Sequence, residues 1–321
     1  MTLHGRFLIF VFFAASAVSA RADETAPTLL ASGRVDDAIA TLHGQLSSSP
    51  NDATAQNLLC RAYFTLGQWD RGISACEKAV ALAPDNGQYH LWLGRMYGGK
   101  ADKGNIITGA VLVGKVRNEF ETAVKLDPNS AEARCDLAEF YLEAPGIVGG
   151  GKDKALQQVE PLSELDPGRA HWVTARVAEK RKNYATAESE YKAAVEASHG
   201  SASAWLNLGL FYRHRERYEE MEKALVQVRP APTDRVDALV DAAEILIHAQ
   251  RNLPEGVELL RAYLKLNKSV EQAPAFKVHY LLGTADEKLG DQQAAATEYK
   301  SALALAKEFQ PAKQALERMN R

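Results

Sequence analysis

A glycine-rich stretch at residues 146–153 carries the motif most closely tied to a defined chemistry in this 321-residue sequence. Gly146, Gly151 and Lys152 follow the spacing G-x-x-x-x-G-K, which opens a phosphate-binding loop. Asp153 stands where such a loop needs a Ser or Thr for Mg²⁺, and the stretch follows a helical pattern where a strand is required. We therefore expect a glycine loop that leads into a helix. An enzyme or nucleotide-binding protein that uses residues 146–153 stays as the alternative function.

The cysteines and histidines predict neither a metal site nor a catalytic pair. The eight histidines are scattered and form no HExxH, and the three cysteines form no CxxC. Cys60 and Cys76 fall on interior positions of two neighbouring helical segments, and we expect two small buried residues there. In an exported protein the same two cysteines could form a disulfide, which stays open as the alternative. Cys135 would remain unpaired. No catalytic residue, metal or cofactor is predicted.

The N-terminal residues have the three parts of a secretory signal. Arg6 supplies the positive charge, residues 7–13 (FLIFVFF) the apolar stretch, and residues 14–22 the small residues of a cleavage zone. Cleavage after Ala20 or Ala22 fits, and the second is favoured. The alternative is an uncleaved membrane anchor, but the uncharged run of 14 residues is short of the roughly 20 that span a bilayer. We expect a signal peptide at 1–22 and export to the periplasm or beyond.

The rest of the composition fits a folded protein. Hydrophobic residues make up 46% and charged residues 25% of the chain, which excludes disordered and disulfide-scaffold classes. A net charge of −3, with no cluster of Lys and Arg, argues against a nucleic-acid partner. Downstream of residue 22 no segment is long and apolar enough to span a membrane.

A repeated pattern of about 34 residues must position any functional side chain. Pro50 and Pro84 lie 34 residues apart, and each follows a stretch with apolar residues at helical spacing. Similar phrases recur at 59–79, 205–225 and 280–302. Each unit reads as two antiparallel amphipathic helices, which bury their apolar faces only when neighbouring units stack.

These units resemble the tetratricopeptide repeat, whose signature is Trp-x2-Leu-Gly-x2-Tyr, then Ala-x3-Phe, then Pro. The residues that carry the resemblance are Trp205, Leu208, Gly209 and Tyr212, then Leu93, Gly94 and Tyr97, and then Leu282, Gly283, Ala295 and Tyr299. The resemblance covers about residues 25–320. It implies an all-α, right-handed superhelical solenoid of antiparallel helix pairs, and a role in binding proteins.

The domain organisation expected from this pattern is a signal peptide at 1–22 and one solenoid at 23–321. We place units near 26–50, 53–86, 87–130, 131–167, 168–201, 202–235, 237–270 and 276–308, with a capping helix at 311–320. Two units are longer than the repeat, and both excesses fall between the two helices, near 98–111 and 144–153. We expect two adjacent loops along one edge that present Ile106, Ile107, Ile147 and Val148. The phrase EAPGIVGGGKDKA is also similar to one in exported bacterial tetratricopeptide proteins.

The first helices of the units are expected to line a concave groove. The groove-facing positions hold Asn57, Arg61, Leu91, Arg95, Trp172, Arg176, Leu206, Leu210 and Arg213. Arginines in a row suit carboxylates, with Trp and Leu as apolar anchors, so the groove is predicted to bind an acidic segment. The alternative is that Glu132, Asp136 and Glu139 pair internally with Arg95 or Arg176.

The function predicted from the sequence is therefore a non-catalytic protein–protein interaction scaffold of the cell envelope. It would bind a peptide or a partner protein in its groove or on its edge loops. The sequence does not identify the partner.

Overall fold

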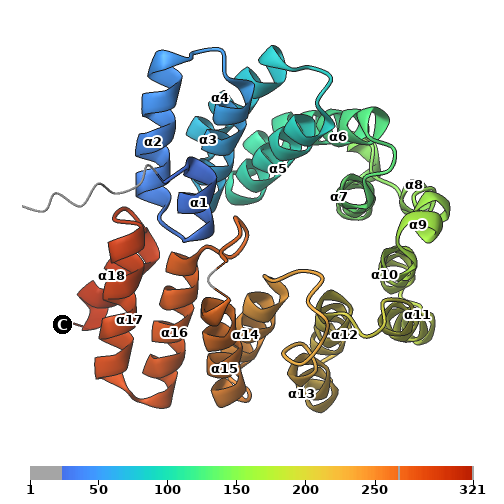
Figure 1. Cartoon of the computed structure of the whole chain (residues 1–321). Helices are drawn as coiled ribbons and strands as arrows, with labels where there is room; N and C mark the ends of the chain where they lie inside the picture. The colour runs from blue at the N-terminus through green and yellow to red at the C-terminus, as the bar shows by residue number, and fades with distance from the viewer. Residues whose placement is uncertain (1–23, 267, 320–321) are drawn as a thin grey trace, which may run out of the picture.

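The structure, a computed structural model, describes residues 24–266 and 268–319, with residues 106–108 described by their backbone alone. The predicted signal peptide, residues 1–22, lies outside the described residues. Antiparallel helix pairs follow one another along the chain, and the described residues contain no β-strand (Figure 1). The predicted fold class, an all-α solenoid of right-handed superhelical helix pairs, is confirmed.

Each pair consists of a first and a second helix. In chain order the pairs are α1 (Ala26–Ala31) with α2 (Val35–Ser48), α3 (Ala53–Thr65) with α4 (Trp69–Leu82), α5 (Gly87–Lys103) with α6 (Ile106–Leu126), α7 (Ala131–Glu143) with α8 (Lys152–Leu156) and α9 (Val159–Leu165), α10 (Pro167–Lys180) with α11 (Tyr184–Ala197), α12 (Ala202–His214) with α13 (Tyr218–Val226), α14 (Ala238–Ala249) with α15 (Leu253–Lys265), and α16 (Ala275–Leu289) with α17 (Gln292–Leu305). A short 3₁₀ helix, η1 (Gly146–Val148), precedes α8, and α18 (Gln310–Met319) follows the last pair. No helix in the described part of the chain is long and apolar enough to cross a membrane.

Side-chain caps begin several first helices and explain where they start. Asp52 accepts a hydrogen bond from the Ala55 N–H at α3, and Ser130 caps α7 in the same way. Asp166 caps α10, where Pro167 takes the first helical position, at which a backbone N–H has no partner within the helix. These local signals set the helix boundaries before any packing between units.

Glycine lets the two helices of a pair approach closely, as the repeat pattern predicts. A Cβ on Gly209 would lie 2.6 Å from Leu225 Cδ2, and one on Gly283 would lie 2.6 Å from Tyr299 Cε1. Gly94 meets the Phe120 ring in the same way. These three glycines are therefore packing positions, because real Cβ atoms do not come so close to their neighbours.

Replacing Gly209 with leucine should lower the free energy of unfolding by about 1–3 kcal/mol, because the added side chain overpacks the contact with Leu225. Urea denaturation followed by far-ultraviolet circular dichroism measures the change. The matched control is Gly44→Leu, since a Cβ on Gly44 in α2 meets nothing within 4 Å. A Gly209→Leu protein as stable as this control would show that the α12–α13 contact is not close.

The two insertions differ in structure. The expected loop at 98–111 is wrong: α5 continues to Lys103 and α6 begins at Ile106, so residues 104 and 105 alone connect them. The extra residues lengthen both helices, to 17 and 21 residues, and Ile106 and Ile107 lie in the first turn of α6. The helical spacing of apolar residues continues through this insertion, which explains the difference. The second insertion does form a compact turn around η1.

The two ends of the solenoid meet and close it into a ring. In Figure 1, α16, α17 and α18 lie beside α1 and α2. The Lys307 N–H donates a 3.0 Å hydrogen bond to Asp36 Oδ2, and the Ser269 N–H donates to the Ala31 carbonyl. An apolar cluster at this seam joins residues of the first two repeats to residues of the last helices: Val35, Ala62, Phe276, Ala295, Tyr299, Ala302, Ala306, Ala312 and Ala315. Each end of the solenoid therefore covers the apolar face of the other. In other solenoids a terminal repeat with a polar outer face usually shields the apolar core from solvent.

Candidate functional site

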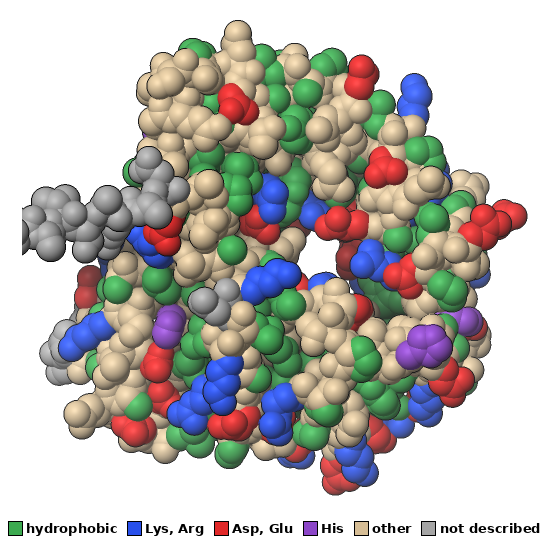
Figure 2. All heavy atoms as spheres, in the orientation of Figure 1, with side chains coloured by type: hydrophobic (Ala, Val, Ile, Leu, Met, Phe, Trp, Pro, Cys, Tyr) green, Lys and Arg blue, Asp and Glu red, His purple; other side chains and the backbone are tan. Residues whose placement is uncertain are grey.

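The first helices α5, α7, α10 and α12 line the inner side of the ring, while α6, α11 and α13 lie outside (Figure 1). We call the inward faces of α3, α5, α7, α10 and α12 the concave surface. Figure 2 shows an opening at the centre of the ring, bordered by both cationic and acidic side chains. Three of the four predicted groove arginines, Arg61, Arg95 and Arg176, contact a neighbouring first helix on this surface.

Two of the predicted apolar anchors are unavailable to a ligand. Leu91 is 0% exposed and Leu206 is 2% exposed, and both lie within the packed core between helices. The prediction that they face the groove is wrong, because both side chains are directed into the core. Trp172 and Leu210 are half-buried, so part of each reaches the surface.

Arg95 on α5 is held by two carboxylates of α7. Its Nε donates to Asp136 Oδ2 and its Nη2 to Glu132 Oε1, both at 2.7 Å. Burial raises the pKa of Asp136, and the ion pair with Arg95 opposes that rise. Arg95 is only 15% exposed, so the pair is a fixed contact between the third and fourth repeats.

Arg176 on α10 pairs with α7 from the other side. Its Nη2 donates to Glu143 Oε1 at 2.7 Å and lies 3.3 Å from Glu139 Oε1. Glu143 also accepts from Lys180 Nζ at 2.6 Å. Burial raises the pKa of Glu139, and Arg176 again opposes the rise.

The internal pairing of Arg95 and Arg176 removes the basis for an acid-binding groove. The acidic residues of α7 stand at helical spacing on one face, between the two arginines, and each arginine contacts at least two of them. A ligand carboxylate would have to displace these acids rather than find free cations. Arg213 forms no ion pair with any described residue. The concave surface therefore presents charges of both signs.

Arg61 on α3 differs from the other two arginines. It has one carboxylate partner, Glu271, which comes from the segment between α15 and α16. Its guanidinium lies 5.2 Å from the centre of the Trp92 ring, and that of Arg95 lies 5.0 Å from it. Two guanidinium groups therefore lie against one aromatic ring between the second and third repeats.

Four amides of the glycine-rich turn at 146–153, those of residues 148–151, are already hydrogen-bonded within the protein. The N–H groups of residues 148, 149 and 150 donate to carbonyls of residues 145 and 146, and that of Gly151 donates to Tyr141. A carbonyl of the turn contacts a cation instead, since Lys154 Nζ lies 3.0 Å from the Gly149 oxygen. A phosphate-binding loop needs the opposite polarity, with free amides facing the ligand. The geometry therefore gives no support to the nucleotide-binding alternative.

The same turn exposes an apolar side chain on a fixed backbone. Ile147 is 95% exposed, and Val148 is half-buried. Arg117 on α6 reaches the Val148 carbonyl at 3.5 Å and so links the turn to the third repeat. Because the amides of residues 148–151 are hydrogen-bonded, the backbone of the turn that carries Ile147 is fixed.

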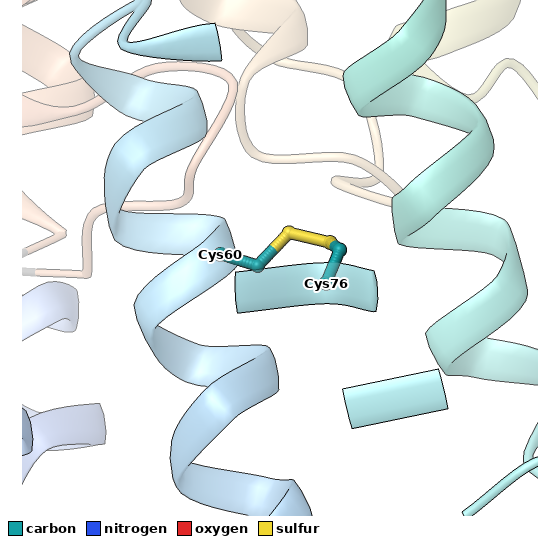
Figure 3. Close-up of a disulfide and its surroundings, with 2 residues drawn as sticks. All are labelled: Cys60 and Cys76. Carbon is teal, nitrogen blue, oxygen red and sulfur yellow. A yellow bond between two sulfur atoms is a disulfide. The ribbon is translucent and has the colours of Figure 1, made fainter. Parts of the chain in front are cut away.

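Cys60 and Cys76 form a disulfide between α3 and α4, with a Cα–Cα distance of 5.2 Å (Figure 3). The expectation of two free buried cysteines is wrong, because the close packing of the two helices places the side chains face to face. Cys135 has no disulfide partner, and burial raises the pKa of its thiol to about 12. A thiol so rarely ionised is a poor nucleophile.

Three histidines pair with a glutamate of the same repeat, a feature that sequence reasoning missed. His171 Nδ1 lies 2.8 Å from Glu190, and His279 Nδ1 lies 2.6 Å from Glu298, 19 residues onward in both cases. The matching pair in the third repeat is His90 with Glu119, 29 residues onward, where the insertion adds ten. Aligning the repeats on one another would have revealed this spacing. No group of three His, Cys, Asp or Glu suited to a metal occurs among the described residues.

The contact between the fifth and sixth repeats should depend on pH through Glu188 on α11, which accepts from Tyr212 and Arg217 of the sixth repeat. Hydrogen bonds, chiefly from Arg217 and then from Lys192 and Tyr212, lower the pKa of Glu188 to about 2 from its usual 4.5. The stabilisation is therefore present above pH 4.5 and is lost as the pH falls toward 2. We expect Glu188→Gln to lower the melting temperature at pH 7 and to have a smaller effect at pH 3.

The control for this prediction is Glu160→Gln, because Glu160 is exposed and forms no ion pair with a described residue. Its effect on the melting temperature should be small at both pH values. If Glu188→Gln lowered the melting temperature by the same amount at pH 7 and at pH 3, this result would contradict an ionised, hydrogen-bonded Glu188.

Comparisons with known proteins identify the repeat that the sequence pattern resembles. One family model for the tetratricopeptide repeat matches residues 29–95. A second model for the same repeat matches residues 149–202 and 175–235. The structure is similar to the crystal structure of yeast Tom70, with a TM-score of 0.54 and 17% identity over 89% of this chain and 58% of that one. A crystal structure of MamA aligns with a TM-score of 0.41 and 21% identity over 53% of this chain and 86% of the other. A search of curated proteins gave no match.

The chain therefore contains tetratricopeptide repeats, arranged as a solenoid of the class that builds protein-interaction scaffolds. It spans 58% of the length of the Tom70 chain, and at this identity the likeness shows the fold alone.

Proposed function

We propose that the protein is a non-catalytic scaffold of the cell envelope that holds an extended segment of a partner protein on its concave surface. The observation that carries the proposal is the row of charged and aromatic side chains on successive first helices, including Trp172 and the arginines Arg95 and Arg176, which are 15% and 16% exposed. Side chains repeated at the spacing of the repeats can contact an extended chain at regular intervals.

The partner segment should carry charges of both signs. Because the inner arginines are already paired with carboxylates, a purely acidic segment would meet the acids of α7 and be repelled. A segment of mixed charge can extend the existing ion-pair network instead. The exposed Ile147 of the turn at 146–153 provides a second contact for a folded part of the partner.

The export of the protein is part of this proposal. The Cys60–Cys76 disulfide supports it, since structural disulfides persist in oxidising compartments and are rare in the reducing cytosol. Mass spectrometry of the mature N-terminus, purified from the envelope, tests it. A new N-terminus at residue 21 or 23 is expected, and an intact residue 1 would contradict cleavage.

The experiment on the binding surface compares proteins captured from an envelope extract by three forms of the chain. Arg95→Ala combined with Arg176→Ala should lose the partner while circular dichroism shows unchanged helical content. The control is Arg261→Ala, which removes an exposed arginine whose i,i+3 pair with Glu258 measures 3.4 Å. If the double variant captures the same partner as the wild type, the concave surface is not the site, and Ile147→Ser then tests the edge.

A further inference from the structure

The segment 268–274, between α15 and α16, crosses the seam of the ring and contacts the first repeats. Its own repeat fixes its shape: the Tyr263 hydroxyl donates to the Ala273 carbonyl at 2.6 Å, and the Val270 N–H donates to the Tyr263 oxygen at 3.0 Å. From this turn the Ser269 N–H donates to the Ala31 carbonyl, and Glu271 pairs with Arg61. The side chain of Glu271 is 13% exposed, so the contact is largely closed to solvent.

These contacts are of the kind that a bound peptide makes. A main-chain amide pairs with a carbonyl of the solenoid, a carboxylate side chain pairs with an arginine, and the apolar Val270 lies between the two residues in the chain. The chain thus occupies one end of its own concave surface.

The occupation is incomplete. Arg61 Nε and Asn57 Nδ2 are buried and have no hydrogen-bond partner among the described residues, and both lie on one face of α3, four residues apart. Asn57 is 95% buried, since 5% of its surface is exposed. A pocket of about 320 Å³ also remains beside the segment, lined by Leu30, Val35 and Leu58 together with Arg61. Buried donors without acceptors are costly, and Arg61 lines this pocket, so a segment that offers its Nε an acceptor would gain over the one present.

Arg61 is also the inner arginine whose carboxylate is most easily exchanged. Arg95 and Arg176 each contact at least two carboxylates from a neighbouring helix, whereas Arg61 contacts one, and that one comes from a segment outside any helix. Exchange at Arg61 breaks one ion pair and disturbs no contact between first helices.

We propose that the surface formed by α1 and α3 at the seam is an extended-peptide site, and that residues 268–274 are its intramolecular occupant. The external partner displaces this segment with one of the same chemistry: a carboxylate side chain for Arg61 beside small apolar residues that enter the pocket. This inference rests on the proposed function. It specifies the class of partner segment that binds one end of the concave surface, and it makes residues 268–274 the competitor that regulates this binding.

The test uses a synthetic peptide with the sequence of residues 268–274, KSVEQAP, with blocked ends and a fluorescent label. Fluorescence anisotropy measures its binding to the wild type and to Glu271→Ala, in which the internal carboxylate is removed. We expect the variant to bind the peptide at least about tenfold more tightly than the wild type does. Adding Arg61→Ala to the variant should abolish this binding.

Three controls make the result specific. Glu258→Ala removes the same charge from an exposed site on α15 and should bind the peptide no better than the wild type. A scrambled peptide of equal composition should not bind, and a peptide with Gln in place of Glu should bind weakly. Circular dichroism verifies that each variant is folded.

The proposal is overturned if Glu271→Ala does not bind the peptide, if the wild type binds it equally well, or if the scrambled peptide binds as tightly. It is also overturned if Arg61→Ala leaves the binding unchanged. The proposed function is judged separately, because partner capture that depends on Arg95 and Arg176 would stand after any of these results.

Discussion

Replacing Phe276 with alanine should open the ring and lower the free energy of unfolding by about 3–5 kcal/mol, the usual cost of removing a buried aromatic side chain. Phe276 is 1% exposed and packs against Phe309, with ring centres 4.9 Å apart. It belongs to the cluster that joins the last repeats to Val35 and Ala62 of the first two. Its loss therefore weakens both the local core and the closure of the ring.

Small-angle X-ray scattering separates these two effects. Phe276→Ala should increase the radius of gyration, because an open solenoid is more extended than a closed ring. The matched control is Phe120→Ala, which removes the same side chain from a 7% exposed position on α6, far from the seam. That variant should lose similar stability in urea without a change in size. An unchanged radius for Phe276→Ala would show that this cluster does not hold the ring closed.

Removing the disulfide should cost about 3 kcal/mol, because the crosslink closes a loop of 16 residues and restricts the unfolded chain. Cys60→Ala combined with Cys76→Ala should therefore unfold at a clearly lower urea concentration than the wild type does. Both side chains are 0% exposed, so the small loss of packing adds to the effect.

Thiol counting checks the disulfide itself. The unfolded, unreduced protein should react with one equivalent of a thiol reagent, at Cys135, and the reduced protein with three. The control Cys135→Ala should react with none before reduction and should keep the stability gained from the disulfide. Three reactive thiols before reduction would contradict the bond.

The arginine row shows where sequence reasoning on the candidate site succeeded and where it stopped. The repeat spacing correctly brings Arg61, Arg95 and Arg176 to the first helices, because the positions follow from helical periodicity. Whether these arginines pair with carboxylates of a ligand or of the protein itself depends on the distance between neighbouring helices. The spacing of residues within one helix does not specify that distance. The same limit applies to Leu91 and Leu206, which are directed into the core.

The sequence by itself determined the helix pairs and their close contacts. These features depend on local signals: capping residues such as Asp52, apolar spacing, and glycine at positions such as Gly209 and Gly283. Such signals act over a few turns of helix, so a single sequence contains them in full.

The tertiary structure alone decided that the ring closes, that segment 268–274 reaches Arg61, and that Cys60 meets Cys76. Ring closure is the sum of small rotations between successive repeats, altered by the two insertions, and no single repeat encodes that sum. The Lys307 N–H and Asp36 are 271 residues apart in the chain yet hydrogen-bonded. Contacts of this kind depend on where every intervening helix lies in space, which the local pattern of residues does not specify.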